Sequence, residues 1–427
     1  MNYTQNEKIM SITENTLIIG IDIAKEVQYA RAFDYRGIEL GKIKSFNNTA
    51  EGFSSFHEWI KALTLEKRKN NVVIGLEPTG HYWFNLAQFL KDIDIRLVLV
   101  NPFHVRRSKE FDDNSQTKND LKDPKTIAKL VIDGRYLEPY IPEGIYSDLR
   151  ISMDMRESLI NNIVKVKNKI SQWLDKYFPE FNRVFTEWDG MAALICLNEF
   201  PTPEKIIATG VPQIVAAWRK KIRASVGVKR ATKLMNAAKS SIGVKEGLRM
   251  AQNELIYNLE QYDLYMKQHD QLEKEIEELA LQISGVKEML TIKGVGIITA
   301  AGFIAEVGDI SRFTHPSQIQ KLAGLNLIEN SSGKHKGKTS ISKRGRSRLR
   351  ALLFRAIMPI VATNKEFKIL HEYYTTRAEN PLKKKQSLIL LCCKLIRIMY
   401  TIITKKVEYN PEKLINDSSL NLQSKVA

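Results

Sequence analysis

Cysteine is scarce in this chain of 427 residues, and its three cysteines are Cys196, Cys392 and Cys393. They form neither a disulfide framework nor a C-x-x-C metal-binding pattern, which excludes a disulfide-rich secreted domain and a cysteine-based zinc finger. The amino-terminal residues lack the apolar core of a signal peptide, and the apolar stretch at 387–403 is interrupted by two basic side chains. We therefore expect a cytoplasmic protein without a membrane segment.

Acidic residues are scarce in the last third of the chain. Residues 286–427 hold 25 Lys and Arg against 10 Asp and Glu, so this third supplies most of the net charge of +17. Residues 1–145 carry 20 of each sign, and residues 146–285 carry 20 basic against 18 acidic side chains. A concentrated positive charge indicates a polyanionic partner, first of all nucleic acid, although a solvated lysine-rich surface has the same composition.

Hydrophobic patterning in the first third predicts a mixed α/β domain at 15–145. Period-two and short apolar runs predict strands, and longer amphipathic stretches predict helices. A meander of three strands comes first, and βαβ units follow it. The expected strands are 17–24, 27–34, a short one after Gly37, 72–78 and 96–102, and the expected helices are 49–67 and 82–91.

Heptad spacing in residues 146–285 predicts two helical seams around an irregular helical insert at about 178–248. The spacing fits a coiled coil between chains and, equally well, an antiparallel helix pair with an intramolecular core. The first seam is Leu159, Ile163, Val166, Ile170, Trp173 and Tyr177, and the second is Leu272, Ile276, Leu279, Ile283, Val286 and Leu290.

A glycine pair between two helical stretches opens the basic third domain, expected at 286–406 and followed by a polar tail at 407–427. Gly294 and Gly296 permit a tight turn, and the first amides of the next helix would then face outward. That geometry resembles a helix-hairpin-helix element and suits a backbone phosphate, although a plain helix–helix turn explains the same glycines.

Four carboxylates in the first third form a candidate metal site. Asp22 lies within an apolar strand and Glu77 at the end of another, where an uncompensated carboxylate is costly. Asp120 and Asp123 are three residues apart and share one face of a helical turn, although Asp123 before Pro124 also suits an N-cap. Together they could hold two Mg²⁺ ions about 3.5–4 Å apart, as in phosphodiester chemistry.

A basic segment rich in serine and glycine lies in the last third. It contains no acid between its first and last cation, so it suits phosphate neutralisation, although a mobile solvated loop has a similar composition. Its cations are Lys334, Lys336, Lys338, Lys343, Arg344, Arg346, Arg348 and Arg350.

Two unrelated sets of motifs resemble the insertion-sequence-110 family of transposases. The first set is GIDIAK at 20–25, LEPTGHYW at 76–83, VNPFHVRR at 100–107 and KNDLKD at 118–123. The second comprises the stretches 291–313 and 321–357, which include the S-G pair and the basic I-S-K-R-G sequence. Both sets occur in the family's order.

The resemblance implies an amino-terminal RuvC-like, RNase H-type catalytic domain, a coiled-coil linker and a helical carboxyl-terminal transposase domain. It also implies that Ser332 attacks DNA and becomes covalently attached to it, with Ser331 as the neighbour that could be confused with it. A structured bridge RNA would pair with donor and target DNA. The protein would form a homo-oligomer, from dimer to tetramer, in which the acidic site of one subunit meets the serine of another.

Two other functions compete with this DNA recombinase. A RuvC-like structure-selective nuclease would hydrolyse DNA with metal-activated water and would form no protein–DNA adduct. A non-enzymatic architectural protein would bind nucleic acid through its basic region but would leave Asp22 and Glu77 unexplained.

Overall fold

A computed structural model describes residues 4–112, 122–223, 227–329, 337 and 339–416. Six residues considered for the predicted sites lie outside the described residues: Asp120, Ser331, Ser332, Lys334, Lys336 and Lys338. The chain divides into two compact units, Met1–Ile141 and Pro142–Ala427, which are described one at a time.

The first unit is built on a six-stranded sheet in the order β3-β2-β1-β4-β5-β6. β1, β2 and β3 pair antiparallel, β4 and β5 continue parallel to β1, and β6 returns antiparallel. The strands are β1 (Thr16–Asp22), β2 (Val27–Phe33), β3 (Glu39–Asn47), β4 (Asn71–Leu76), β5 (Arg96–Val100) and β6 (Tyr136–Leu137).

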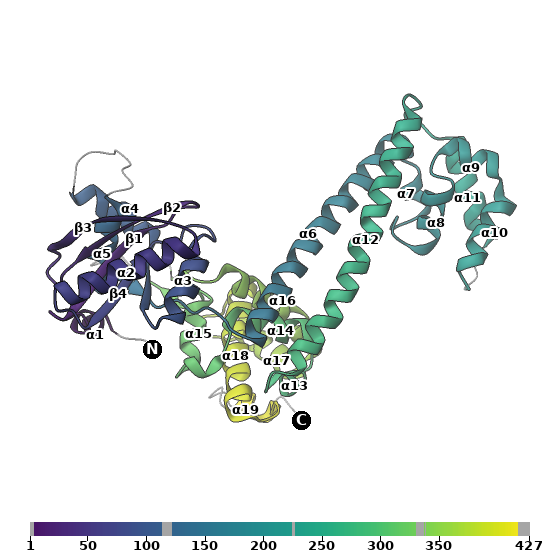
Figure 1. Ribbon diagram of the computed structural model, residues 1–427. Coiled ribbons are helices and arrows are strands. Elements are labelled where there is room, and N and C mark those ends of the chain that lie inside the picture. Colours follow the sequence, from purple (N-terminus) through teal and green to yellow (C-terminus); the bar gives the residue numbers. More distant parts are fainter. Residues whose placement is uncertain (1–3, 113–121, 224–226, 330–336, 338, 417–427) are drawn as a thin grey trace. The chain divides into compact units, whose positions relative to one another are not determined.

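Helices cover both faces of this sheet (Figure 1). The core of one face contains buried side chains of α2 and α3, including Phe56 and Leu86. The opposite core contains Val105 of α4 and buried side chains of α5, including Val131. The helices of this unit are α1 (Gln5–Met10), α2 (Ala50–Glu66), α3 (Trp83–Asp92), α4 (Pro102–Asp112) and α5 (Asp123–Ile132).

The predicted mixed α/β domain is confirmed in this unit. The three-strand meander, the two following parallel strands and the helices between them occur where the patterning placed them, but the third strand, predicted to be short, has nine residues. Apolar residues alternate between the two cores along β1, so both of its faces are buried and the strand is almost continuously apolar.

The second unit is mostly helical. Its elements are α6 (Ile145–Tyr177), α7 (Phe181–Val184), α8 (Met191–Glu199), α9 (Pro203–Thr209), α10 (Val211–Lys221), α11 (Val228–Lys239), α12 (Leu248–Leu281), α13 (Val286–Met289), α14 (Ile297–Val307), η1 (Ile310–Arg312), α15 (Pro316–Leu322), β7 (Leu327–Ile328), β8 (Ser340–Ile341), α16 (Ser347–Thr363), α17 (Lys365–Thr376), α18 (Lys384–Lys405) and α19 (Pro411–Asn416).

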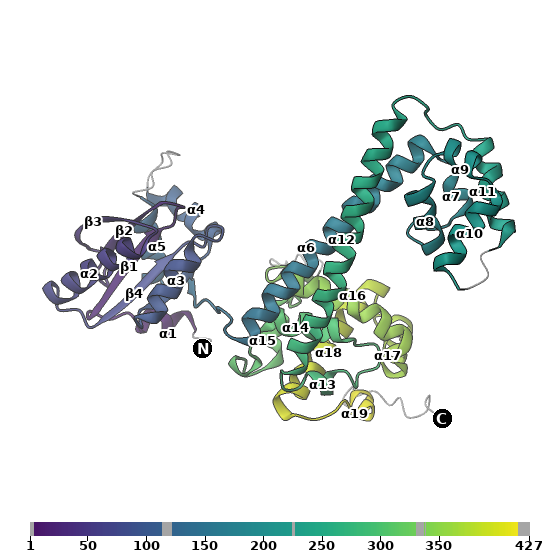
Figure 2. The ribbon, with the colours of Figure 1, turned by 45° about the vertical axis from the view of Figure 1, so that its right-hand side comes forward.

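The long helices α6 and α12 form an antiparallel pair within one chain (Figures 1 and 2). The indole Nε1 of Trp173 donates a hydrogen bond to the carbonyl oxygen of Ala251 at 2.7 Å, and Arg156 pairs with Glu273 at 2.7 Å. Most of the first heptad seam, from Ile163 to Tyr177, is buried in this intramolecular core. A coiled coil between chains stays a prediction.

The second heptad seam does not continue along one helix, so that part of the prediction was wrong. α12 ends at Leu281, and Gly285 then adopts a φ of +90°. A Cβ at Gly285 would lie 2.9 Å from the side chain of Ile403 in α18, so the chain turns where only glycine fits easily. Ile283 and Val286 lie beyond this helix end and are buried in the carboxyl-terminal core.

Two apolar cores stabilise the second unit. The insert helices α7–α11 pack on the adjoining ends of α6 and α12, and Cys196 lies in this core, where burial raises its pKa to about 12. The other core contains residues of α13–α18. α18 is long and apolar enough to cross a membrane, but Leu391, Leu395 and Met399 on it are buried among neighbouring helices, as in a core helix of a folded domain.

Candidate functional site

The two strand carboxylates lie side by side at one edge of the first sheet. β1 ends at Asp22, and Glu77 directly follows β4. The strands are parallel neighbours in which Ile21 is paired with Leu76, so the next register position brings Asp22 beside Glu77. Both carboxylates are partly buried. The structure therefore places the two predicted acids at the carboxyl ends of adjacent parallel strands.

Alternation along the strands places these acids on the face covered by α5. Ile21 and Leu76 belong to the opposite core, so the residues that flank them face α5. On that face, a Cβ at Gly20 would lie 1.8 Å from the carbonyl oxygen of Pro124. Gly20 therefore allows the start of α5 to lie directly against β1.

The third described acid, Asp123, is the first residue of α5 and is 8% exposed. It precedes Pro124, which contacts the sheet at Gly20, two residues before Asp22. A helix N-terminus favours a negative charge because of its exposed amides and dipole. Asp22, Glu77 and Asp123 thus belong to one edge and one face of the sheet, which we call the acidic edge.

The acidic edge alone does not make up a metal site. Within the described residues, which exclude Asp120, no group of three or more His, Cys, Asp or Glu side chains is placed so that it could hold a metal ion. The four-carboxylate site therefore stays a prediction.

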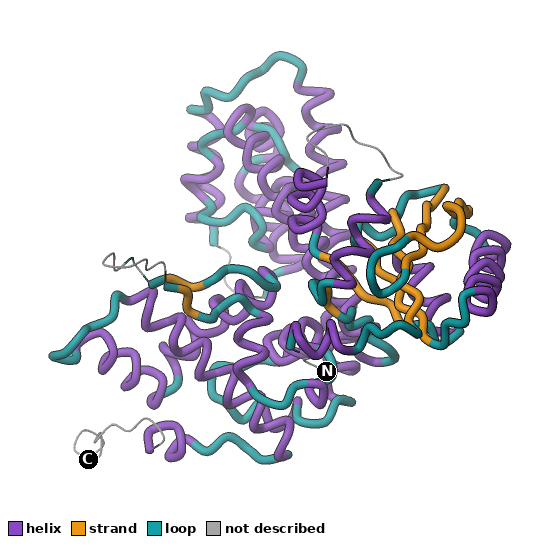
Figure 3. The backbone as a smooth tube through the Cα atoms, turned by 90° about the vertical axis from the view of Figure 1, so that its left-hand side faces the viewer, coloured by secondary structure: helices purple, strands orange, loops and turns teal. Residues whose placement is uncertain are grey.

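In the second unit, a short hairpin carries the segment that contains the predicted serine. β7 pairs with β8 antiparallel, with Leu327 opposite Ile341 (Figure 3). Further hydrogen bonds continue the ribbon away from the loop: the amide of Ser342 donates to the Asn326 carbonyl at 2.9 Å, and the amide of Arg346 donates to the Leu322 carbonyl at 2.7 Å. We call residues 322–346 the serine hairpin.

Two glycines let the strands of the serine hairpin approach closely. Gly324 has a φ of +68°, and a Cβ there would lie 2.9 Å from the carbonyl carbon of Lys343. Gly345 has a φ of +150°, and a Cβ there would lie 2.4 Å from the carbonyl oxygen of Leu322. The base of the hairpin is therefore a tight backbone contact that side chains at these positions would break.

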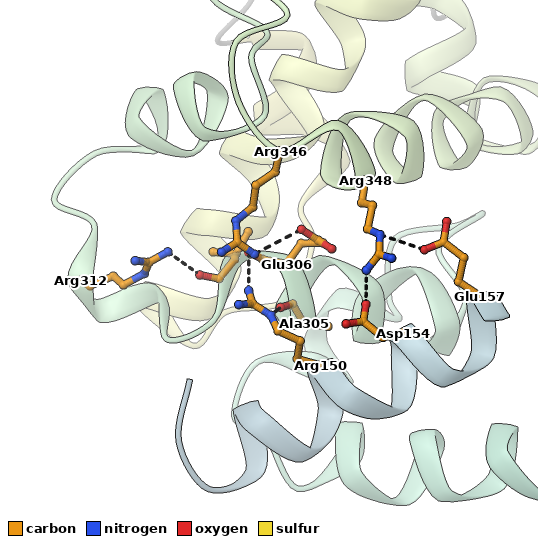
Figure 4. Close-up of polar contacts among 9 residues, drawn as sticks. Arg150, Asp154, Glu157, Ala305, Glu306, Arg312, Arg346 and Arg348 are labelled. Atoms are coloured by element: carbon orange, nitrogen blue, oxygen red, sulfur yellow. Dashed lines mark hydrogen bonds and ion pairs between the residues drawn. The ribbon is translucent and has the colours of Figure 1, made fainter. Parts of the chain in front are cut away.

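Arg346 joins the serine hairpin to the end of α14 (Figure 4). Its guanidinium donates to the backbone carbonyl of Glu306 at 3.0 Å and lies 3.4 Å from the Glu306 carboxylate. Arg150 donates to the carbonyls of Ala305 and Glu306, and Arg312 donates to that of Val307. Three cations thus surround the carboxyl end of α14, where the helix dipole favours positive charge.

Two further arginines of the predicted phosphate-binding set have partners within the chain. Arg348 pairs with Asp154 and, at 3.0 Å, with Glu157, both on α6 (Figure 4). Arg350 donates to the carbonyl of Ala323 at 2.9 Å. In contrast, the side chains of Lys343 and Arg344 are exposed. The structure gives Arg346, Arg348 and Arg350 structural contacts, and their phosphate contacts stay predictions.

The two glycines before α14 differ in their surroundings. Gly294 has a φ of +97°, and a Cβ there would lie 2.9 Å from the Cα of Ile360 on α16, so a turn and a close packing contact explain it. Gly296 is the N-cap of α14 and is exposed, with nothing within 4 Å of a Cβ placed on it. Of the pair, Gly296 has the open surroundings that a phosphate contact needs.

Comparisons with known proteins agree in both units. Residues 19–179 match a family model described as "Transposase", and residues 286–374 match one described as "Transposase IS116/IS110/IS902 family". A protein of insertion element IS116 from Streptomyces clavuligerus is 24% identical over 94% of this chain and 98% of its own length. The chain belongs to the IS110 family of transposases. It is a DNA transposase, as its similarity to named transposases also supports.

Two named relatives match smaller parts of this IS110-family chain. The mini-circle putative transposase for IS117 of Streptomyces coelicolor is 22% identical over 75% of this chain and 78% of its own length. The transposase for insertion sequence element IS1111A of Coxiella burnetii is 37% identical over 19% of this chain and 22% of its own length.

Sequence reasoning missed some residues that shape the two candidate sites of this IS110-family transposase. Gly20 lies within an apolar strand, where glycine often marks a close approach of another backbone, so its position was a usable signal. Glu306 and Arg150 gave no such signal, because their partners are distant in sequence and only folding brings them together.

Proposed function

We propose that this transposase moves an insertion element by Mg²⁺-dependent cleavage and exchange of DNA strands through a covalent serine–DNA intermediate. Ser332 is the nucleophile, and Asp22, Glu77, Asp120 and Asp123 are the metal ligands of a RuvC-like, RNase H-type domain. The observation that carries this proposal is the acidic edge, where three of the four acids share one edge and one face of the sheet.

The acidic edge suits a hard divalent cation. Carboxylate oxygens are the ligands that Mg²⁺ prefers, and carboxylates crowded without a cation would repel one another. Asp123 is nearly buried and has its helix tight against β1, so its position is fixed by packing. Asp120, three residues earlier, would supply the fourth carboxylate. Bound Mg²⁺ would supply charge stabilisation for the attacking and leaving oxygens of a phosphodiester.

The serine step conserves the energy of the phosphodiester bond. The Ser332 hydroxyl loses its proton to a base, its Oγ forms a bond to phosphorus, and the bond from phosphorus to a sugar oxygen breaks. The departing sugar oxygen takes up a proton. A hydroxyl of another strand then attacks the same phosphorus and releases the serine, so strands are rejoined without ATP.

The surrounding cations would bind the DNA and stabilise charge on the phosphate. This role belongs in the proposal to the exposed Lys343 and Arg344 of the serine hairpin, to Lys334, Lys336 and Lys338, and to Gly296. Arg346, Arg348 and Arg350 would contribute to it only by exchanging intramolecular partners for phosphate, and Gly294 supports the turn.

A complete active site requires both units, because the acids belong to the first and the serine to the second. We propose that a homo-oligomer, dimer to tetramer, combines the acidic edge of one subunit with the serine hairpin of another. A structured bridge RNA would pair with donor and target DNA, so the cytoplasmic protein would need to read little sequence itself. Sequencing RNA that copurifies with the protein tests this part: loops complementary to the element's junctions are expected, and their absence would remove the RNA from the proposal.

The test of the chemistry is a protein–DNA adduct that survives denaturant. Wild-type protein with Mg²⁺ and DNA spanning the element's ends should form it, and Ser332→Ala should form none while still binding DNA. Ser331→Ala is the matched control and should keep the adduct. An adduct lost only in Ser331→Ala would move the nucleophile by one residue. Cleavage by Ser332→Ala at the wild-type rate without an adduct would favour the water-driven nuclease.

The acidic edge is tested by Asp22→Asn and Glu77→Gln, which remove charge with little change of shape. Both should abolish adduct formation while the protein keeps its fold and its DNA affinity. Asp92→Asn, on the exposed end of α3, is the control and should behave like the wild type. Wild-type adduct yield in either test variant would show that the site is wrongly assigned.

A further inference from the structure

A second acid-free basic stretch lies in the helical insert, far from the serine hairpin in sequence. Residues 205–245 contain ten Lys and Arg and no Asp or Glu. The stretch lies between the two matched family regions, 19–179 and 286–374. Neither the acidic edge nor the serine hairpin therefore accounts for this charge.

The cations of this stretch are exposed, and the apolar residues between them form the insert's core. Ile214, Trp218 and Leu234 are fully buried, which fixes the opposite faces of α10 and α11 toward solvent. Within the described part of the chain, none of these cations forms an ion pair with a carboxylate. The exposed set is Lys205, Arg219, Lys220, Lys221, Arg223, Lys229, Arg230, Lys233, Lys239 and Lys245.

Two helix ends bring seven of these cations together. The last turn of α10 carries Arg219, Lys220 and Lys221, and α11 begins at Val228, directly before Lys229. α10 packs against α11, and Figure 2 shows them side by side. Cations from both helices therefore flank the short connection between them. We call Arg219, Lys220, Lys221, Arg223, Lys229, Arg230 and Lys233 the insert patch.

The cations that the insert patch places on α11 lower the stability of that helix, whereas those in the last turn of α10 suit its dipole. The first turn of α11 has no acidic residue, and its N-cap, Gly227, makes no side-chain cap hydrogen bond. Lys229 and Lys233 are four residues apart, so like charges are neighbours on one helix face. Cations near a helix N-terminus and like-charge pairs each cost a few tenths of a kcal/mol. A bound polyanion would turn these costs into attraction.

Two cations elsewhere in the chain show the contrasting arrangement. Lys267 on α12 pairs with Asp263 at 2.6 Å, and Arg31 on β2 pairs with Glu39 at 2.6 Å. A merely solvated helical surface commonly interleaves both signs in this way. The insert patch has one sign only, which favours a negatively charged partner.

The side chains between the cations point to a double-stranded ligand. Proteins that hold unpaired bases stack them on exposed aromatic rings. Residues 205–245 contain one aromatic residue, Trp218, and its side chain is fully buried with its Nε1 bonded to the Ala192 carbonyl at 3.0 Å. The surface therefore offers phosphate contacts without a stacking platform.

We propose that the insert patch is a second DNA-binding surface, which holds the phosphate backbone of duplex DNA without reading its sequence. The proposal rests on the DNA substrate of the transposase and not on the serine or the metal ligands. Its partner is duplex DNA outside the bonds that are cut, because the patch carries no group for phosphoryl transfer. In this proposal the insert holds DNA, and the two regions that match the family models, 19–179 and 286–374, carry out the chemistry.

The test uses the full-length protein and a short DNA duplex of unrelated sequence. The variant Lys220→Gln, Lys229→Gln and Lys233→Gln removes three exposed cations and keeps good helix formers. Each lost phosphate contact should flatten the dependence of log affinity on log salt by about 0.9. We expect a slope lower by about 2–3 and a duplex affinity about tenfold weaker or more near physiological salt.

A control variant removes the same charge from the first unit. Lys42→Gln, Lys61→Gln and Lys67→Gln change three exposed lysines, one in β3, one in α2 and one directly after α2, and the wild-type slope should be kept. Thermal unfolding followed by circular dichroism checks that both variants fold.

Three results would overturn the proposal. The first is a patch variant with the wild-type slope and affinity, and the second is a control variant that loses as much affinity. The third is weaker binding of structured RNA with unchanged binding of duplex DNA, which would make the patch an RNA surface. The duplex carries no element sequence, so these outcomes do not depend on strand cleavage, and the adduct test of Ser332 fails or succeeds separately.

Discussion

Two acid-free basic stretches of this transposase, 334–350 and 205–245, have the same kind of composition and different surroundings. In the stretch at 334–350, three arginines hold backbone carbonyls or carboxylates of the same unit. In the insert stretch, the cations of α10 and α11 face solvent. Charge counted along a sequence therefore does not show which cations are available to a ligand. A guanidinium that already has a partner must give up that contact to bind phosphate. An exposed lysine without an ion pair loses only side-chain conformational entropy when it binds phosphate.

The comparison also separates the use of an arginine from the use of lysines. The guanidinium of Arg346 contacts both the backbone carbonyl and the carboxylate of Glu306 at the end of α14. A planar group with several N–H donors suits such a double contact. The lysines of the insert patch are flexible point charges that follow a phosphate backbone without fixed geometry. We therefore expect substitutions in the serine hairpin to change stability, and substitutions in the insert patch to change binding.

The largest expected effect is that of Arg346→Met. This change keeps an apolar stem but leaves the Glu306 carboxylate, whose side chain is 17% exposed, without its cation. The free energy of unfolding of the second unit should fall by about 1–3 kcal/mol, the range for hydrogen bonds to charged groups. Urea unfolding measures it. The adduct yield should fall as well, because the base of the serine hairpin loses its link to α14.

The control for Arg346→Met is Lys220→Gln, an exposed change in the insert patch. Its free energy of unfolding should stay within about 0.5 kcal/mol of the wild type, as for most surface substitutions. Equal destabilisation by the two changes would break the distinction between the two basic stretches.

A charge reversal in the insert should move stability and binding in opposite directions. Lys229→Glu with Lys233→Glu places one negative charge in the first turn of α11, where the helix dipole favours it by about 0.3–1 kcal/mol at low salt, and a second charge one turn later, where the dipole acts only weakly. The melting temperature should therefore stay the same or rise slightly. Duplex DNA affinity should fall about tenfold or more, because contacts become repulsion. A variant that melts earlier and binds normally would contradict the role of the patch.

Arg348→Gln should have a smaller effect on stability. The pairs of Arg348 with Asp154 and Glu157 lie at the surface, with about half of each side chain exposed. Exposed ion pairs contribute about 0.2–1 kcal/mol, and added salt weakens them. The difference in unfolding free energy from wild type should shrink as salt is added. A loss as large as that of Arg346→Met would show that Arg348 is part of the same structural contact.

The smallest effect is expected from Lys167 of α6, which pairs with Asp189 of the insert, and it concerns the decrease of stability at acid pH. Its hydrogen bond holds the pKa of Asp189 below its ordinary value of 3.8. A lowered carboxylate pKa adds stability above the ordinary value, and that stability is lost as the pH falls from about 3.8 through the folded-state pKa. Lys167→Met should reduce this loss, measured by unfolding at pH 5 and below. A decrease as large as that of the wild type would show that the pair contributes no stability.

The sequence determined the local elements and the chemical parts of this protein. Short, nearly continuous apolar runs located β1 and β4, because both faces of each strand are buried. The isolated acids Asp22 and Glu77 were visible because a carboxylate in an apolar strand needs a partner. Motifs in both units were sufficient to indicate the transposase family that the comparisons support.

Tertiary structure decided which of these parts meet. Parallel pairing of β1 with β4 brought Asp22 beside Glu77, and the close fit of α5 at Gly20 added Asp123 to the same face. The helix α12 ends at Leu281 and the chain turns at Gly285, although the heptad spacing of apolar residues continues beyond this point. Contacts between distant segments occupied Arg346 and left the insert patch exposed. Spacing along a chain fixes the face on which a side chain lies, but its partner comes from packing between elements that the local pattern does not encode.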